Sequence, residues 1–102
     1  MKQDYRQGEV ILKRVQSVPK GAKKLSHLVL AEGEITGHKH EICNGNAELF
    51  EKDGTLFLRV HDEEVTIVHP EHKPNTIKKG TYRIDLPQEY DYFSKEIRRV
   101  ID

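Results

Sequence analysis

Residues 44–61 read Asn-Gly-Asn-Ala-Glu-Leu-Phe-Glu-Lys-Asp-Gly-Thr-Leu-Phe-Leu-Arg-Val-His, and they decide the fold class of this chain. Asn44-Gly45 and Asp53-Gly54 are typical of two-residue β-hairpin turns, because Asn, Asp and Gly tolerate the positive φ that these turns need. Between and after them, residues 47–51 and 55–61 carry apolar side chains in the alternation of half-buried strands. The stretch therefore predicts antiparallel β structure with tight hairpins.

The same pattern of short apolar runs and turn residues continues in both directions. It predicts seven strands, at residues 9–15, 25–31, 34–42, 47–51, 55–61, 65–69 and 81–86. We expect a turn at residues 62–64 and a glycine turn just before residue 81. The polar residues 1–7 are expected to be flexible, and helical spacing of apolar residues predicts a short C-terminal helix over 91–101. Together these features indicate one domain over residues 1–102, an all-β antiparallel sandwich or small barrel with the helix covering an edge.

The composition argues against several classes of protein. Seventeen basic residues balance seventeen acidic ones, so no net field draws the chain toward nucleic acid or a membrane, and self-association is possible. The apolar runs are too short to span a bilayer, and the N-terminal residues do not have the pattern of a secretory signal. The single cysteine, Cys43, cannot form an intrachain disulfide, which favours a reducing compartment. We therefore expect a cytoplasmic protein for which a homo-oligomer is possible and nucleic-acid binding is disfavoured.

Four of the six histidines fall in two tight pairs, His38 with His40 and His69 with His72. Because side chains alternate across a strand, His38 and His40 share a face with Ile42, and His69 shares a face with apolar residues of its own strand. A buried imidazole needs partners for both ring nitrogens, and metal coordination is one way to supply them. The pattern predicts a site for a divalent transition metal (Zn²⁺, Fe²⁺, Ni²⁺ or Mn²⁺) at these four histidines.

Three carboxylates are candidates for a catalytic base or an additional ligand beside such a metal: Glu41, Glu48 and Glu71. A histidine-bound metal with an open position activates water or binds an oxygen ligand, and a nearby carboxylate can then accept a proton. These residues are the candidate catalytic groups if the protein is an enzyme, a question that the sequence leaves open.

A structural interpretation of the histidines also stays open, because histidines near strand ends are often exposed or hydrogen-bonded surface residues. His27 and His61 have no second histidine close in sequence, and we expect them to be structural or exposed. On an unbroken strand Cys43 faces away from His38 and His40, and we expect it to be a small buried residue.

Gly33 to His40 spell Gly-x-x-x-x-His-x-His, which resembles the first motif of the cupin superfamily. Cupins are small jelly-roll barrels in which the two histidines of this motif, a later glutamate and a third histidine bind a divalent metal. The resemblance covers this one motif and implies a cupin-like barrel with His38 and His40 as ligands. Glu48 lies further from His40 than the glutamate ligand of that family, and no Pro-x-Gly turn precedes His69.

Other segments resemble short uncharacterised proteins of bacteria and their phages. They are Arg6–Val10, Gly37–His40, His69–Pro74, Gly80–Arg83 and Tyr90–Val100. This resemblance implies a free-standing protein, often linked to mobile elements, and it implies no particular activity.

Two functions from different classes follow. The first is a cupin-like β protein that binds a divalent metal through clustered histidines and acts on an unknown small polar molecule. The alternative is a non-enzymatic binding or assembly module, a phage or mobile-element accessory or self-associating protein, whose histidines are structural or interfacial. Nucleic-acid binding ranks last, because it needs two separate basic clusters on one face: Lys20, Lys23 and Lys24 with Arg98 and Arg99.

Overall fold

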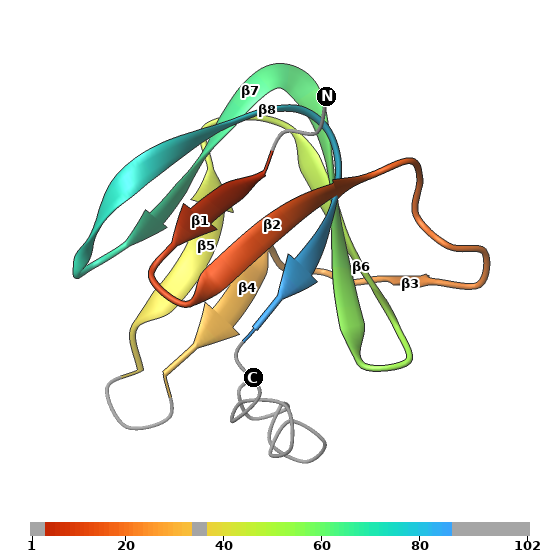
Figure 1. Ribbon diagram of the computed structural model, residues 1–102, viewed down its shortest axis with the longest axis horizontal. Helices are drawn as coiled ribbons and strands as arrows, with labels where there is room; N and C mark the ends of the chain where they lie inside the picture. The colour runs from red at the N-terminus through yellow and green to blue at the C-terminus, as the bar shows by residue number, and fades with distance from the viewer. Residues whose placement is uncertain (1–3, 34–36, 87–102) are drawn as a thin grey trace.

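The computed structural model describes residues 4–33 and 37–86, and all the regular structure in these residues is β-strand. Figure 1 shows the strands of these two ranges: β1 (Tyr5–Gln7), β2 (Val10–Val15), β3 (Lys23–Lys24), β4 (Val29–Glu32), β5 (Lys39–Cys43), β6 (Ala47–Lys52), β7 (Thr55–His69) and β8 (His72–Asp85). The all-β prediction is confirmed, although the number of strands and several of their boundaries differ from expectation.

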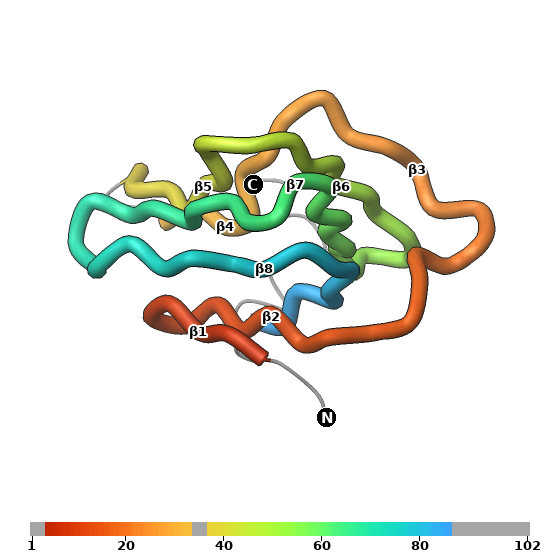
Figure 2. Tube along the Cα trace, turned by 90° about the horizontal axis from the view of Figure 1, so that it is seen from above, coloured from red at the N-terminus to blue at the C-terminus, as the bar shows by residue number. Residues whose placement is uncertain are grey.

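The strands form one antiparallel sheet that curls into a half-barrel (Figures 1 and 2). Its order is β1-β2-β8-β7-β5-β4, and β6 pairs with both β7 and the short β3. Figure 2 shows β1 and β2 on one side of the central β7–β8 pair and β5 on the other. This curl agrees with the barrel-like alternative of the prediction, and it brings the ends of β5, β7 and β8 close to the β1–β2 hairpin.

β7 is one long strand, so the expected turn at residues 62–64 is wrong. The pairing with β8 shifts from Val60 opposite Gly80 to Glu64 opposite Lys78, which leaves three residues of β7 facing one of β8. This bulge contains the polar residues whose pattern resembles a turn. The chain keeps its direction through the bulge, and the strand bends there, as bulged strands do.

Gly80 lies inside β8, so the glycine turn predicted just before residue 81 is also wrong. Its φ is 149°, and a Cβ at this position would stand 2.6 Å from Cζ of Arg14. A glycine inside a strand often marks a bend or a close approach of another group. Here it allows the Arg14 side chain to pass over the strand opposite the bulge in β7.

The two turns of residues 44–61 differ in what they connect. Asp53-Gly54 closes the β6–β7 hairpin with φ values of 52° and 81°, as a type I′ turn requires, so this prediction is confirmed. Asn44-Gly45 does not close a hairpin, because β5 and β6 both pair with β7, at residues 66–68 and 55–60. The predicted hairpin there is wrong: the turn moves the chain from one half of β7 to the other.

The N-terminal segment contributes an additional strand to the sheet. Tyr5–Gln7 form β1, which pairs with β2 through a two-residue turn at Gly8-Glu9. Hydrogen bonds also attach β1 to β8: Asn75 Nδ2 donates to the Arg6 carbonyl at 2.6 Å, and the Lys78 N–H donates to the Tyr5 hydroxyl at 3.2 Å. Gly8-Glu9 therefore form a turn between two strands, and the strand predicted at residues 9–15 begins at Val10.

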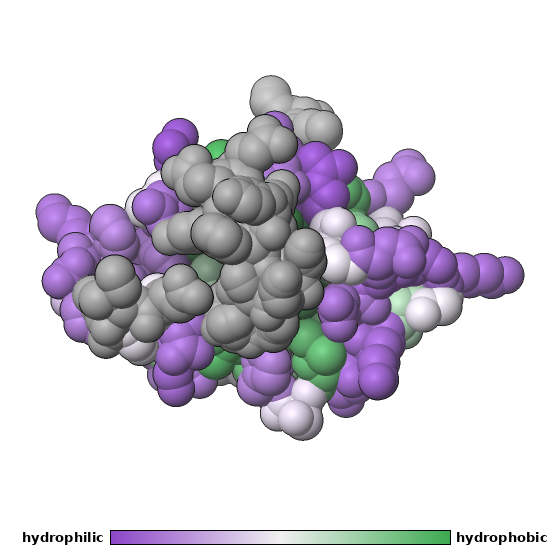
Figure 3. All heavy atoms as spheres, turned by 90° about the horizontal axis from the view of Figure 1, so that it is seen from below, coloured by the Kyte–Doolittle hydropathy of each residue, from purple (hydrophilic) through white to green (hydrophobic). Residues whose placement is uncertain are grey.

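The core lies inside the curl of the sheet. Twelve apolar side chains are buried there: Val10, Leu12, Leu30, Ile42, Leu49, Leu58, Val60, Val65, Ile67, Ile77, Tyr82 and Ile84. On the face drawn in Figure 3, the side chains outside the grey residues are mainly hydrophilic. The predicted helix over 91–101 lies outside the described residues. Within the described ranges, no helix has the length and apolar character needed to cross a membrane.

Candidate metal centre

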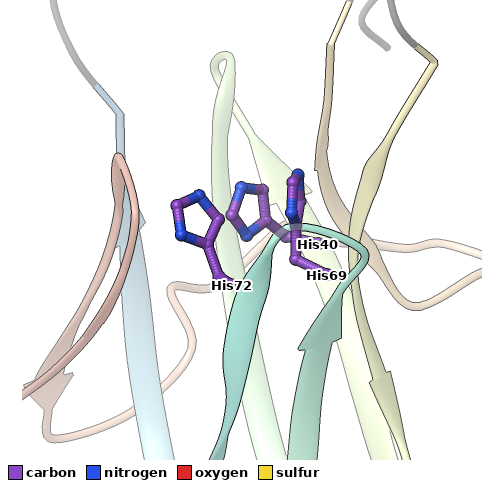
Figure 4. A group of neighbouring side chains, drawn as sticks. All are labelled: His40, His69 and His72. Carbon is purple, nitrogen blue, oxygen red and sulfur yellow. The ribbon is translucent and has the colours of Figure 1, made fainter.

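Three histidines meet where β7 turns into β8 (Figure 4). His69 ends β7 and His72 begins β8, and the two residues are paired across the turn at Pro70-Glu71. β5 lies next to β7 with Ile42 opposite Ile67, which places His40 beside His69. The sheet register thus brings His40 to a pair of histidines that lies some thirty residues further along the chain.

The three rings are in close contact. The ring centroids of His40 and His69 are 4.1 Å apart, and that of His72 lies 4.7 Å from His69 and 5.7 Å from His40. One nitrogen from each ring can be chosen so that all three nitrogens lie within 4.8 Å of one another. His40 is buried, with 7% of its surface exposed, whereas His69 is half-buried and His72 is exposed.

Gln7 fixes which nitrogen of His40 carries the proton. Its Nε2 donates to the carbonyls of Ile67 and Lys73, at 3.0 and 2.8 Å, so its Oε1 faces His40 Nδ1 at 2.9 Å. An amide oxygen only accepts, and His40 Nδ1 must therefore be the donor. The lone pair of His40 then resides on Nε2, for which the described residues show no hydrogen-bond partner. This is the arrangement that orients a histidine to bind a metal.

The surroundings favour the neutral forms of His40 and His69. Burial, together with the positive charges that His69 and His72 would carry, lowers the pKa of His40 to about 4. Burial also lowers the pKa of His69, with help from His72 and His38, against the opposing effect of Glu71 and Glu9. Neutral imidazoles at neutral pH are the form that binds metal ions.

His69 holds a hydrogen bond that restricts how it binds. Its Nδ1 accepts the Glu71 N–H at 3.0 Å, across the turn. In the neutral ring the proton then sits on Nε2. Coordination through Nδ1 would displace the Glu71 N–H directly. Coordination through Nε2 would move the ring proton to Nδ1, which could then no longer accept the Glu71 N–H. Either mode therefore breaks this hydrogen bond. His69 is therefore the ligand whose local hydrogen bonding changes most on binding.

The fourth predicted ligand, His38, lies at the edge of the cluster. It precedes β5, so the strand predicted over 34–42 begins later than expected, at Lys39. The His38 ring is 5.6 Å from the His69 ring, and its Nδ1 lies 3.7 Å from Glu71 Oε2. It does not belong to the group whose nitrogens converge within 4.8 Å.

A pocket of about 300 Å³ opens onto the cluster. His38 and the three clustered histidines line it together with the carboxylates of Glu9, Glu32 and Glu71, and no lysine or arginine among the described residues lines it. Gly8, in the β1–β2 turn, forms another part of the wall. Its φ is 60°, and a Cβ there would stand 2.6 Å from Nε2 of His72.

Only one of the three candidate catalytic carboxylates belongs to this pocket. Glu71 lines it. Glu41 is exposed on β5 and borders a separate shallow hollow beside Val68, because it lies on the opposite face from His40. Glu48 is part of a surface ion cluster on β6, where Lys24, Arg59 and His61 contact its carboxylate. These contacts lower the pKa of Glu48, with the hydrogen bonds from His61 and Lys24 as the main causes.

The remaining sequence candidates are structural. His27 is exposed and its Nδ1 accepts the Val29 N–H at 3.1 Å, while His61 is exposed and bound to Glu48. Both agree with the expectation for histidines without a neighbouring histidine. Cys43 is partly exposed at the end of β5 and does not line the pocket, so the expectation that it is buried is wrong.

The sequence interpretation overlooks four residues of the site. They are Gln7, Gly8, Glu9 and Glu32. The available signal is Gly8-Glu9, a Gly-x pair that fits a two-residue hairpin turn. Interpreted in this way, it makes Tyr5–Gln7 a strand and places Gln7 at a paired position.

Residues 6–86 match a protein family that is described as a domain of unknown function, DUF8820. The chain belongs to the DUF8820 family. The matched range contains Gln7, all three clustered histidines and every residue that lines the pocket, so the candidate centre lies entirely within this DUF8820 domain. No curated protein and no solved structure shows a significant match to the chain.

Proposed function

We propose that this DUF8820 protein binds one divalent transition-metal ion through His40, His69 and His72. The observation that carries the proposal is the buried His40 ring. Its Nδ1 is hydrogen-bonded to Gln7, its Nε2 has no hydrogen-bond partner among the described residues, and the His40 side chain lines the pocket. A buried polar atom without a partner is costly, and a metal ion would satisfy it.

The three histidines fit a metal in number, chemistry and spacing. Three neutral imidazoles are a common ligand set for catalytic zinc, with a further position left for water or substrate. Nitrogens bound at ~2.0–2.1 Å to a tetrahedral ion lie about 3.3 Å apart. The present upper limit of 4.8 Å therefore calls for a small inward movement of the rings. His69 and His72 are less buried than His40, and the movement of His69 breaks its hydrogen bond from the Glu71 N–H.

The pocket supports metal-assisted handling of a small polar molecule. When bound, a divalent ion here would supply Lewis-acid chemistry and lower the pKa of a coordinated water. The volume of about 300 Å³ is at the small end for ligand pockets. Glu71, at the pocket wall and 3.7 Å from His38, is the carboxylate placed to accept a proton from a ligand there. The sequence likeness to cupins supports only the part of the site contributed by β5.

Metal binding to purified, metal-free protein tests the proposal. Zn²⁺ titration by calorimetry should give about one equivalent, and Co²⁺ should give the visible spectrum of a site with nitrogen ligands. His40→Ala or His69→Ala should weaken binding at least ~100-fold, because each removes one of three ligands. His38→Ala should change the affinity by less than ~10-fold, because His38 lies outside the converging group.

His27→Ala and His61→Ala are the matched controls, since both remove a histidine outside the cluster. They should leave the Zn²⁺ affinity unchanged. Substoichiometric Zn²⁺ that persists in a His40→Ala/His69→Ala variant would disprove the metal centre.

A further inference from the structure

The charged side chains that line the pocket beside the histidine cluster are acidic. Three carboxylates line the pocket, those of Glu9, Glu32 and Glu71, and no lysine or arginine of the described ranges does. Pockets that bind phosphates or carboxylates usually place arginine, lysine or backbone N–H groups toward the anion. Among the described residues, the lining of this pocket has the opposite arrangement.

The carboxylates come from three separate parts of the fold. Glu9 lies in the β1–β2 turn, Glu32 ends β4, and Glu71 lies in the β7–β8 turn. They therefore surround the opening instead of forming one acidic strip. With a divalent ion at the histidines, the pocket lining would place three acidic side chains around one doubly charged ion. At low ionic strength the field of these side chains acts on a charged ligand that enters the pocket.

We propose that the open coordination position of this centre is selective for neutral or cationic nitrogen or oxygen ligands and disfavours anions such as phosphates and carboxylates. This inference rests on the proposed metal centre. The metal would bind a donor atom of the ligand. The three carboxylates would favour a ligand whose remaining groups are neutral or positively charged. A small amine, amide or imidazole compound fits both conditions, whereas a small carboxylic acid or phosphate ester fits only the first.

The experiment compares two probes on the Co²⁺-loaded protein at low ionic strength and about pH 8. Azide is an anionic ligand and imidazole is a largely neutral one, and both change the visible Co²⁺ spectrum when they coordinate. We expect imidazole to bind at least ~10-fold more tightly than azide. In a Glu9→Gln/Glu32→Gln variant, azide affinity should rise about 3- to 10-fold while imidazole affinity stays within about 2-fold, since removing like charge helps only the anion.

Glu63→Gln is the matched control, because Glu63 is an exposed carboxylate in the β7 bulge and does not line the pocket. It should leave both probe affinities unchanged. A wild-type protein that binds azide as tightly as imidazole would overturn the selectivity. So would a loss of Co²⁺ from the Glu9→Gln/Glu32→Gln variant, because a carboxylate would then be a metal ligand. A wild-type protein that takes up no Co²⁺ would instead refute the metal centre itself.

Discussion

Gln7 is the residue on which the orientation of His40 depends. Its amide reaches two carbonyls of β7 and β8 and one ring nitrogen of β5, so one side chain links three strands under the histidine cluster. The Lys73 carbonyl belongs to a bulge. Between the pairs Ile67–Asn75 and His69–His72, two residues of β8, Lys73 and Pro74, lie opposite the single residue Val68 of β7. A carbonyl at a bulge has no ladder partner, and Gln7 supplies one.

Replacing Gln7 should therefore affect both stability and metal binding. Gln7→Ala removes the side-chain donor to the Ile67 and Lys73 carbonyls and the acceptor of the His40 Nδ1 proton, and we expect a loss of about 2–4 kcal/mol in the free energy of unfolding. Zn²⁺ affinity of the folded variant should fall about 10- to 100-fold, because the His40 ring loses its orienting partner. Urea unfolding and calorimetry measure the two effects.

Gln16→Ala is the control for this prediction, because Gln16 is exposed. It should change stability by less than about 0.5 kcal/mol. Unchanged Zn²⁺ affinity in folded Gln7→Ala protein would show that Gln7 does not position His40.

At the level of elements, two hairpin turns lie beside the site and shape it together. The β7–β8 turn carries His69 and His72, and the β1–β2 turn packs its Gly8 against the His72 ring. The approach is so close that a Cβ on Gly8 would meet Nε2 of His72 at 2.6 Å. The β1–β2 hairpin thus restricts where His72 can lie.

Gly8→Ala should displace the His72 ring and weaken Zn²⁺ binding about 10-fold or more, in addition to the strain of an alanine at a φ of 60°. Gly54→Ala separates these two effects, because Gly54 also has a positive φ, 81°, but no atom lies within 4 Å of its added Cβ. Both variants should lose about 1 kcal/mol or more of stability from backbone strain. Equal Zn²⁺ affinities in the two variants would show that the contact with His72 does not matter.

For the whole molecule, the neutral histidine cluster predicts a stability that falls in mild acid when no metal is bound. The pKa of His40 is about 4 in the folded protein and about 6.5 in the unfolded chain. As the pH falls below about 6.5, the unfolded chain takes up a proton first, so folding becomes less favourable until about pH 4. His69 contributes in the same direction.

We expect up to about 3 kcal/mol of lost stability between pH 6.5 and 4 from His40, as measured by urea unfolding at a series of pH values. A His40→Leu variant should show a smaller slope in this window, and His27→Ala should keep the slope of the wild type. Glu48 acts at lower pH, because its lowered pKa means that its ion contacts are lost only as the pH falls below the ordinary range of a glutamate. A wild-type stability that stays flat from pH 6.5 to 4 would contradict the depressed pKa of His40.

The turns show how far local sequence reasoning reaches. Asp53-Gly54 closes a hairpin as predicted, because the two positive φ values are a property of those two residues. Asn44-Gly45 has the same signal, yet the strands on its two sides do not pair with each other. Residues 62–64 look like a turn, but the chain continues in β7 and residues 61–63 form a bulge. A turn signal indicates a local departure from regular strand geometry, whereas the pairing of the flanking strands depends on which faces must be buried.

The sequence by itself determined the β class, the Asp53-Gly54 hairpin turn, and the faces on which His40 and His69 lie. These follow from the two-residue period of a strand, which is a local property: His40 shares the buried face of Ile42, and His69 that of Ile67. Only the tertiary structure decided that β5 lies beside the end of β7, that His38 stays at the rim, and that Gln7, 33 residues before His40, orients its ring. Strand neighbours and register are set by burial across the whole sheet, so no local pattern specifies them.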